Sequence, residues 1–291
     1  MFQKTVMQGQ KILVTGGGTG LGRGMAERFA ELGANVVLAG RRKAVLDAAA
    51  EEIRAAHGAQ VDTFALDIRS SEMVDEVMGE IWAAGPLTGL VNNAAGNFIA
   101  RTEDISPKGF EAITRIVING TFYCTHAAGR RWIEAGTGGN VLSITTTWVR
   151  NGAPFVVPSA MSKSAVHAMT MSLASEWGRY GIRLNTIAPG EIPTEGMSKR
   201  LNPGEKPGER TARINPLGRC GTIEELANLA TFLMSGGCDW LTGETIAMDG
   251  AQALATGGSF YELRAWGDAE WQAARASIET QNQKDRAGRS G

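Results

Sequence analysis

The stretch KILVTGGGTGLG, residues 11–22, joins a short β-branched run to a cluster of glycines. The run from Lys11 to Thr15 predicts a buried strand, and the pattern from Met25 to Ala30 predicts a helix soon after it. Glycines at such a junction let the backbone approach a pyrophosphate, whose negative charge then lies at a helix N-terminus. We therefore expect a dinucleotide to bind here, at residues Thr15, Gly16, Gly18, Thr19, Gly20 and Leu21.

Outward from this loop, short apolar runs alternate with longer helical patterns. The longest predicted helix extends from Met161 to Tyr180, and the other strands are expected at 35–39, 61–66, 89–92, 140–145, 183–187 and 244–248. Apolar strands separated by helices are typical of a parallel sheet that is covered on both faces. Right-handed crossovers then give a doubly wound α/β fold of the Rossmann type, which we predict as a single domain over residues 1–291.

Two segments interrupt this alternation. The stretch near 191–213 contains Pro193, Pro203 and Pro207 and predicts a long surface excursion that covers the substrate site. Beyond residue 252 we expect a C-terminal tail with a helix around Trp271 to Ile278 and a frayed polar end.

The composition excludes several classes of protein. A formal net charge of −1 argues against nucleic acid or an anionic membrane as the main partner. The 38 glycines follow no strict period, which excludes a collagen-like chain. Cys124, Cys220 and Cys238 are too scattered for a disulfide framework or a metal site, so we expect free thiols and no metal. With no signal peptide or membrane span in view, we expect a cytoplasmic protein.

The glycine spacing carries a family resemblance. Gly16, Gly20 and Gly22 fit the pattern T-G-x-x-x-G-x-G, whereas G-x-G-x-x-G does not fit this segment. The former resembles the short-chain dehydrogenase/reductase superfamily. The likeness continues in NNAAG at 92–96, in VING at 117–120 and in PGEIPT at 189–194. The resemblance implies that a nicotinamide dinucleotide also binds at Asn93, Ala94, Lys163, Pro189, Gly190 and Ile192.

The residues after the second predicted strand bear on which dinucleotide binds. An NAD site would place a carboxylate there, but this chain has Arg41 and Arg42. Guanidinium groups bind phosphate in a bidentate manner, which favours the 2′-phosphate of NADP(H). The alternative is that both arginines form a solvated face. Asp67 follows the third strand, where the resemblance implies a contact with the adenine.

The superfamily's proton-donating tyrosine is missing. It stands four residues before the lysine, and Ser159 occupies that position before Lys163. Ketone reduction requires a proton donor at the developing alkoxide, so carbonyl or alcohol chemistry becomes less favourable. Tyr123 shares a helix face with Asn119 and is the one tyrosine worth testing as a substitute acid.

A second resemblance bears on the missing tyrosine. Four segments are similar to the 2,4-dienoyl-CoA reductases: NNAAGNFI at 92–99, ITT at 144–146, FVVPSA at 155–160 and EELANLA at 224–230. In mitochondrial members a serine precedes the lysine by four residues, and the donor tyrosine lies eleven residues before that serine. The corresponding residue here is Trp148, so the chain departs from this family as well.

The expected chemistry tolerates that departure. A dienoyl thioester that takes hydride at its distal alkene carbon places charge on the thioester oxygen, and the proton finally goes to carbon. The oxygen then needs hydrogen-bond donors rather than an acid, and an indole N–H is a donor only. Trp148, Asn97 and Thr146 are candidate donors. The resemblance adds Lys163, Ser159 and the helix residue Asn119 to the catalytic set. The alternative is that Trp148 only packs or lines a pocket.

The resemblance also implies the substrate and the assembly. Arg69 and Arg200 match positions that contact the CoA moiety, and Phe98 and Ser106 are weaker candidates for the acyl-CoA site. Each arginine alone is also compatible with a surface charge. The helices over 121–132 and 162–177 resemble the faces that pair subunits in this superfamily, so we expect a homotetramer.

Three hypotheses remain open. The first is an NADPH-dependent reductase of a 2,4-dienoyl-CoA or related enoyl thioester. The second is a general short-chain carbonyl or alcohol oxidoreductase, which the lost tyrosine disfavours. The third is an NADP-binding protein without catalysis, which Trp148 motivates.

Overall fold

The computed structural model describes residues 1–194, 208–255, 265–274 and 276. The chain divides into two compact units, Met1–Ala253 and Leu254–Gly291. The prediction of a single domain over the whole chain stays a prediction. Of the predicted excursion near 191–213, residues 195–207 lie outside the described part, as does the polar end of the tail.

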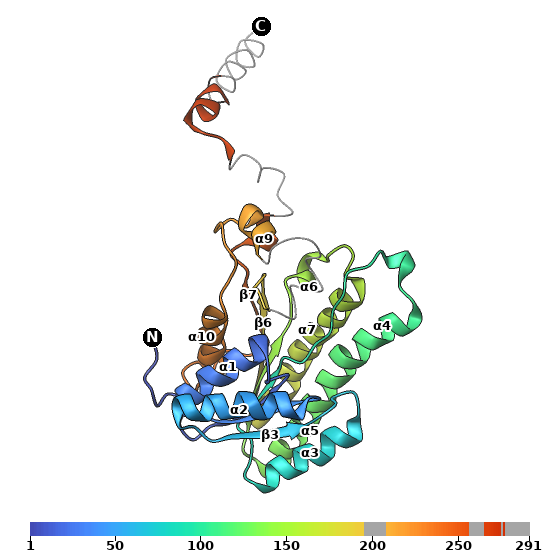
Figure 1. The fold of residues 1–291 in the computed structure, drawn as a ribbon, viewed down its shortest axis with the longest axis vertical. Helices are drawn as coiled ribbons and strands as arrows, with labels where there is room; N and C mark the ends of the chain where they lie inside the picture. Colours follow the sequence, from blue (N-terminus) through green and yellow to red (C-terminus); the bar gives the residue numbers. More distant parts are fainter. Residues whose placement is uncertain (195–207, 256–264, 275, 277–291) are drawn as a thin grey trace. The chain divides into compact units, whose positions relative to one another are not determined.

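The first unit is built on one seven-stranded sheet (Figure 1), with the strand order β3-β2-β1-β4-β5-β6-β7 and every pair parallel. The predicted doubly wound fold is confirmed. The order reverses between β1 and β4, and ligands of open α/β sheets bind beside such a switch point at the carboxyl ends of the strands. The strands are β1 (Lys11–Thr15), β2 (Asn35–Gly40), β3 (Val61–Ala65), β4 (Gly89–Asn92), β5 (Gly139–Ile144), β6 (Ile182–Pro189) and β7 (Thr245–Met248).

Helices follow the strands in the expected alternation. The α-helices with described bounds are α1 (Gly20–Glu31), α2 (Lys43–His57), α3 (Ser71–Ala83), α4 (Pro107–Thr114), α5 (Thr121–Ala135), α6 (Trp148–Asn151), α7 (Val157–Trp177), α9 (Glu209–Ile214), α10 (Ile223–Met234) and α11 (Gln252–Ala255). Short 3₁₀ turns are η1 (Thr102–Asp104) and η3 (Gly178–Tyr180), and a π-helix, η2 (Arg115–Gly120), lies between α4 and α5.

Both faces of the sheet are buried, because successive side chains of each strand point to opposite sides. In β1, Ile12 and Val14 pack into a core with residues of α1, α2 and α10, such as Phe29. Leu13, between them, packs into a second core with residues of α3, α5 and α7, such as Trp132. The apolar runs of the sequence therefore encode two covered faces.

Helix α7 differs in its bounds from the predicted 161–180. It begins four residues earlier, at Val157, with Pro158 in its first turn. Proline is favoured in a first turn because its missing N–H has no intrahelical acceptor there. The predicted last three residues form the 3₁₀ turn η3 instead, and Gly181 follows with a positive φ of 73°.

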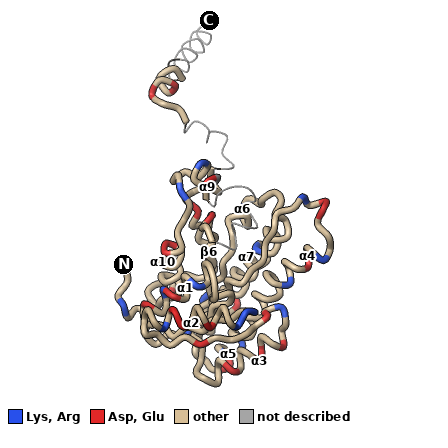
Figure 2. The backbone as a smooth tube through the Cα atoms, viewed as in Figure 1, with Lys and Arg blue, Asp and Glu red and all other residues tan. Residues whose placement is uncertain are grey.

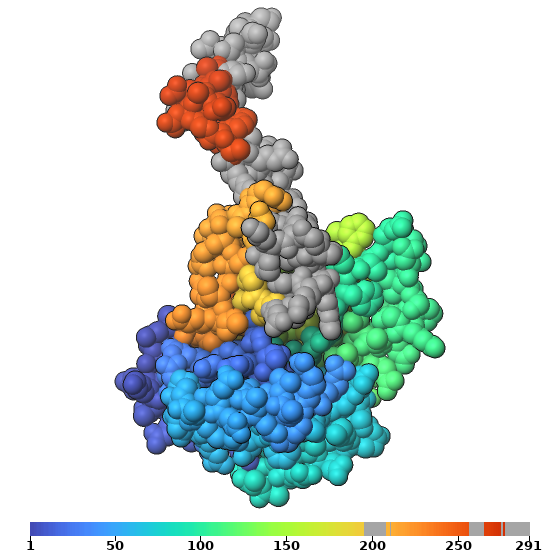
Figure 3. Space-filling view, viewed as in Figure 1, coloured from blue at the N-terminus to red at the C-terminus, as the bar shows by residue number. Residues whose placement is uncertain are grey.

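The surface of the first unit has no single sign of charge. Figure 2 shows acidic and basic residues interspersed along its helices. Residues from α2 through α3 form an unbroken surface, blue to cyan in Figure 3. Among the described residues, no helix is long and apolar enough to span a membrane.

The described part of the second unit is short. Residues 268–274 and 276 are helical, so this helix begins before the predicted start at Trp271. The indole rings of Trp266 and Trp271 meet edge to face, with centroids 4.9 Å apart.

Candidate active site

The loop after β1 is locked to the end of β4. The buried Thr15 hydroxyl donates to the carbonyl of Val91 (3.2 Å) and accepts from the backbone N–H groups of Asn93 (3.1 Å) and Ala94 (3.2 Å). The Asn93 amide in turn donates to the carbonyl oxygens of Thr15 (3.1 Å) and Gly16 (3.3 Å). Four of the predicted dinucleotide-binding residues thus form one hydrogen-bonded unit.

Two glycines, Gly16 in this loop and Gly22 in the first turn of α1, are required by their surroundings. Gly16 has a positive φ of 66°, and a Cβ there would lie 3.1 Å from Ala94 Cα. At Gly22 a Cβ would lie 2.5 Å from the carbonyl oxygen of Gly16 and 2.4 Å from Asn93 Nδ2. Any side chain at Gly22 would push the loop away from α1.

The start of α1 fits a pyrophosphate. Thr19, the residue before the helix, makes no side-chain capping hydrogen bond, and the first turn contains no acidic residue. The first N–H groups of a helix have no intrahelical partners and carry a partial positive charge. Together with the close-packed glycines, this arrangement suits the diphosphate of a nicotinamide dinucleotide.

Four charged side chains follow the ends of β2 and β3. Arg41 and Arg42 are exposed just after β2. Asp67 follows β3 and accepts from Arg69 Nε at 2.9 Å; this hydrogen bond, with further help from the charge of Arg41, lowers the pKa of the Asp67 carboxyl. The guanidinium of Arg69, predicted from resemblance to contact CoA, is therefore held at the carboxylate predicted to contact the adenine.

Lys163 lies at the carboxyl end of β5. It is buried on α7, and its Nζ donates to the backbone carbonyl of Ile144. Burial lowers the pKa of its ammonium group from 10.5 to about 8. Ser159, in the first turn of the same helix, is also buried, with 3% of its surface exposed.

Just past β5, Thr146 and Trp148 lie at the start of α6. The Thr146 hydroxyl accepts from the backbone N–H of Trp148 (2.9 Å), and the Trp148 side chain is half-buried. The side-chain oxygen of Asn97 accepts from the backbone N–H of Phe98 (2.9 Å). This leaves the Asn97 amide hydrogens as its donor groups.

Asn119 lies within the π-helix η2, where it is exposed. Short π-helical stretches inserted between α-helices are frequent at functional sites. Sequence reasoning missed this irregularity. The signal present in the sequence is the run Ile116-Val117-Ile118 followed by Asn119 and Gly120, all residues with low helix propensity. Tyr123, one turn further on, is half-buried on α5.

The segment predicted to hold the nicotinamide follows β6. Gly190 donates its N–H to the carbonyl of Met248 in β7 (3.0 Å), and a Cβ on it would lie 2.9 Å from Asp249. Pro189 ends β6, and Ile192 is buried against the first core.

The predicted substrate residues have different surroundings. Ser106 caps α4, because its hydroxyl accepts from the N–H of Gly109 (3.1 Å). Phe98 packs against the small core that contains Ile113 and Val117. Arg200 lies outside the described residues.

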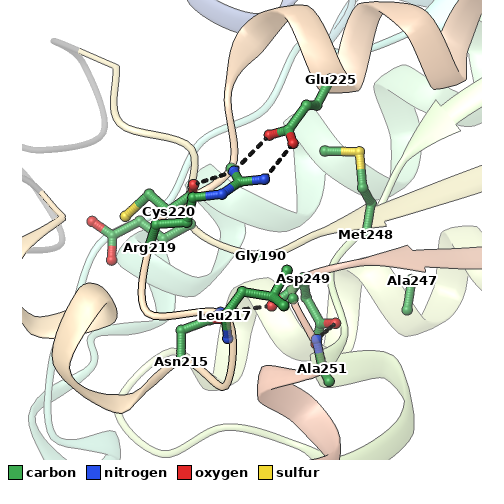
Figure 4. A pocket seen from close by; sticks show the side chains of 13 residues that line it. Gly190, Asn215, Leu217, Arg219, Cys220, Glu225, Ala247, Met248, Asp249 and Ala251 are labelled. Carbon is green, nitrogen blue, oxygen red and sulfur yellow. Dashed lines mark hydrogen bonds and ion pairs between the residues drawn. The ribbon is translucent and has the colours of Figure 1, made fainter.

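A cavity that sequence reasoning missed opens beside Gly190, between the loop at 215–221 and the end of β7 (Figure 4). Arg219 forms an ion pair with Glu225 on its wall (2.6 Å), and this guanidinium lowers the pKa of Glu225 to about 2. The Asn215 amide donates to the carbonyl of Asp249 (2.8 Å). Among the described residues, no group of three or more histidines, cysteines, aspartates and glutamates has a metal-binding arrangement.

Comparison with known proteins identifies the family. The family model described as Enoyl-(Acyl carrier protein) reductase matches residues 16–251. A probable 2,4-dienoyl-CoA reductase 3 of Caenorhabditis elegans is 44% identical over 276 residues, covering 91% of this chain and 89% of that protein. A probable 2,4-dienoyl-CoA reductase of Bacillus subtilis is 42% identical over 250 residues, covering 85% of this chain and 98% of that protein.

Solved structures agree with this result. A short-chain dehydrogenase from Bacillus anthracis superposes with a TM-score of 0.78 at 42% identity, covering 85% of this chain and 97% of that one. The chain belongs to the short-chain dehydrogenase/reductase superfamily, which makes it an enzyme of an oxidoreductase family, and its similarity to 2,4-dienoyl-CoA reductases is confirmed.

The superfamily binds NAD or NADP, and solved structures of similar fold include both. A gluconate 5-dehydrogenase from Burkholderia cenocepacia (29% identity, TM-score 0.80, covering 86% of this chain and 98% of that one) is in complex with NADP. A 3-ketoacyl-(acyl-carrier-protein) reductase from Brucella melitensis is complexed with NADH. It has 28% identity and a TM-score of 0.78, covering 85% of this chain and 99% of that one.

Proposed function

We propose that this protein is an NADPH-dependent reductase that transfers hydride to a 2,4-dienoyl-CoA or a related enoyl thioester. The observation that carries the proposal is the grouping at the end of β5. Lys163 is bound to the Ile144 carbonyl, the tyrosine position four residues before it holds Ser159, and Trp148 and Thr146 stand at the adjoining turn. This grouping offers donors to an oxyanion without offering the superfamily's acid.

The dinucleotide supplies the hydride when it is bound. The uncapped start of α1 would hold its diphosphate, and Asn93, Ala94, Pro189, Gly190 and Ile192 would line its nicotinamide half. Arg41 and Arg42 support NADP(H) over NAD(H), because a 2′-phosphate gains charge-assisted hydrogen bonds there.

The protein's own part in the chemistry is to hold negative charge on the thioester oxygen. The Trp148 indole N–H and the Asn97 amide would donate to that oxygen, with Thr146 and Asn119 completing the catalytic set. Removing one such donor typically costs about 2.7–4 kcal/mol of transition-state stabilisation. Lys163 is charged below a pKa of about 8 and would bind the ribose while adding positive potential.

The remaining assignments rest on the family resemblance. Arg69, Arg200, Phe98 and Ser106 are proposed to contact the acyl-CoA. A homotetramer in the cytoplasm is proposed for the assembly and its location.

The test is NADPH oxidation with hexa-2,4-dienoyl-CoA, followed by the absorbance of the reduced nicotinamide. We expect turnover that Lys163→Ala lowers strongly and that Lys108→Ala, an exposed lysine on α4, leaves unchanged. Turnover no faster in the unchanged protein than in Lys163→Ala overturns the proposal.

Two other results would select the alternatives. Robust oxidation of simple secondary alcohols, abolished by one substitution at the site, would support a general carbonyl or alcohol oxidoreductase. Tight NADPH binding without hydride transfer to any of a panel of acyl-CoA compounds would support a dinucleotide-binding protein without catalysis.

A further inference from the structure

A row of polar side chains crosses the sheet on the side covered by α7. The Nδ1 atom of His167 lies 2.7 Å from the hydroxyl oxygen of Thr245 in β7. That hydroxyl is 2.8 Å from the hydroxyl of Thr186 in β6, which lies 3.3 Å from the hydroxyl of Thr145, just past β5. The three threonines are buried, each with 6% or less of its surface exposed. The proposed reaction uses none of these four side chains.

The row ends beside the carbonyl group that binds Lys163. Thr145 directly follows Ile144, whose carbonyl accepts from Lys163 Nζ. The Thr145 hydroxyl also donates to the carbonyl of Ile187 in β6 (3.1 Å), and its backbone N–H donates to the same oxygen (2.8 Å). The end of β5 is therefore fixed to β6 at the residue next to the Lys163 contact.

His167 and Lys163 lie on the same helix, one turn apart, so they share a face of α7. Lys163 joins that face to the end of β5, and His167 joins it to β7. These two polar contacts join α7 to the sheet at two points that are one helical turn apart.

Thr245 also binds α6, the helix that carries Trp148, to β7. Arg150 of α6 donates from Nη2 to the backbone carbonyl of Thr245 (2.7 Å). One residue of β7 is thus bound by α6 through its carbonyl and by α7 through its hydroxyl. The helices that carry Trp148 and Lys163 are therefore both hydrogen-bonded to Thr245.

Holding a helix in one position on a sheet requires directional contacts. An apolar helix–sheet contact tolerates small shifts, whereas a hydrogen bond weakens steeply when its geometry is lost. Buried hydroxyls demand partners, so a fully connected row favours one arrangement of the helix over neighbouring ones.

We propose that His167 is a positioning residue, which acts through Thr245, Thr186 and Thr145 to hold α7 where the Lys163 ammonium group meets the dinucleotide. The proposed reaction assigns it no contact with the substrate or the dinucleotide. The inference rests on the proposed function only in taking Lys163 as a dinucleotide-binding residue.

The experiment measures dinucleotide affinity by fluorescence titration with NADPH and, separately, with NADH. No acyl-CoA is present, so the result does not depend on which thioester is reduced or whether one is. His167→Leu removes the polar end of the row, whereas His167→Asn keeps an amide near the place of Nδ1. Met171→Leu, at an exposed position one turn further along α7, is the matched control.

We expect His167→Leu to weaken binding about tenfold, the loss that corresponds to one moderate hydrogen bond, and His167→Asn to recover most of it. Met171→Leu should leave the affinity unchanged. A merely structural role for His167 would lower the melting temperature and leave the affinity of the folded protein intact, so an unchanged affinity in His167→Leu overturns the proposal. Equal loss in the leucine and asparagine variants overturns it too.

A second pair of variants covers the case in which His167→Leu does not fold. Thr245→Val removes the hydroxyl at nearly constant shape, and Thr245→Ser retains it. We expect the valine variant to bind NADPH about tenfold more weakly than the serine variant. Equal affinities in the two variants contradict the role assigned to the row.

Discussion

The end of β1 and the end of β5 border the same sheet edge but are built in different ways. The loop after β1 is set by glycines and backbone contacts, with Gly16 and Gly22 pressed against Asn93 and Ala94. The end of β5 is held by side-chain hydrogen bonds. Lys163 donates to the Ile144 carbonyl, and the Thr146 hydroxyl accepts from the Trp148 N–H. The row of threonines connects this end to His167.

The difference shows which part of the molecule can change its chemistry. In the loop after β1, a side chain at Gly16 or Gly22 would collide with neighbouring backbone atoms, so neither glycine can be replaced unless the backbone moves. A site fixed by hydrogen bonds keeps its frame when a single side chain at its centre is replaced. Ser159 stands where the superfamily has its proton-donating tyrosine, and Trp148 stands where the mitochondrial dienoyl-CoA reductases that this chain resembles have theirs. The frame around both residues remains connected.

The largest expected effect is at Gly22. A Cβ there would lie 2.5 Å from the carbonyl oxygen of Gly16, so Gly22→Ala must displace the loop from α1. We expect it to abolish dinucleotide binding and to lower the free energy of unfolding by about 1–3 kcal/mol, measured by titration and by urea denaturation.

Gly178→Ala is the matched control. This glycine has a helical φ of −53°, and apart from its chain neighbours no atom of the described residues lies within 4 Å of an added Cβ. We expect unchanged binding and a gain in stability of about 0.4–1 kcal/mol, because alanine restricts the unfolded chain. Equal losses in the two variants would contradict a steric origin for the loop.

The next effect tests the end of β5. Trp148→Phe keeps an aromatic ring and removes the N–H donor, so we expect kcat with hexa-2,4-dienoyl-CoA to fall by about 10²–10³ at nearly constant NADPH affinity. Trp148→Tyr restores a donor and should retain activity. If Trp148→Phe reacts as fast as the unchanged protein, the indole only packs.

The burial of Lys163 predicts a pH dependence of stability in the protein free of dinucleotide. Its pKa is lowered from 10.5 in the unfolded chain to about 8 in the folded one. Below about pH 8 both states are protonated, and the cost of burying the charge is present in full. Between about 8 and 10.5 the folded state has released the proton that the unfolded state still holds, so stability rises with pH.

Lys163→Met removes this dependence. Relative to that variant, the unchanged protein should gain up to roughly 3 kcal/mol in free energy of unfolding across this pH range, as urea denaturation measures it. A constant difference between the two proteins at every pH would show that the amine titrates normally.

The smallest effect concerns the choice of dinucleotide. Arg41 is exposed, so water screens any contact that it makes. We expect Arg41→Ala to weaken NADPH binding about tenfold and NADH binding hardly at all, a loss in the range of one charge-assisted hydrogen bond. Equal weakening of both would assign the residue to the general surface.

The sequence was sufficient for the fold because its constraints are local or periodic. The apolar runs placed each strand to within a few residues, as at β7, predicted from Glu244 and found from Thr245. The glycine cluster demanded a strand before it and a helix after it, and both are present.

The missed features depend on side-chain contacts that neither periodicity nor a family motif marks. The Thr245–His167 contact joins residues 78 positions apart, and no periodicity marks it. Ser106 at the substrate stays a prediction, but sequence reasoning did not reveal that its hydroxyl also caps α4 by accepting from the N–H of Gly109. The Arg69 side chain turns to Asp67, a local pairing that the family pattern did not reveal.

The central claim is that this site stabilises negative charge on a thioester oxygen and delivers the proton to carbon. The most direct measurement is the reaction of hexa-2,4-dienoyl-CoA with NADPH in D₂O, with the product analysed by mass spectrometry and NMR. The account predicts an enoyl-CoA with an intact thioester and a single deuterium bound to carbon. An aldehyde or alcohol product, or a reduced thioester without deuterium on carbon, would contradict it.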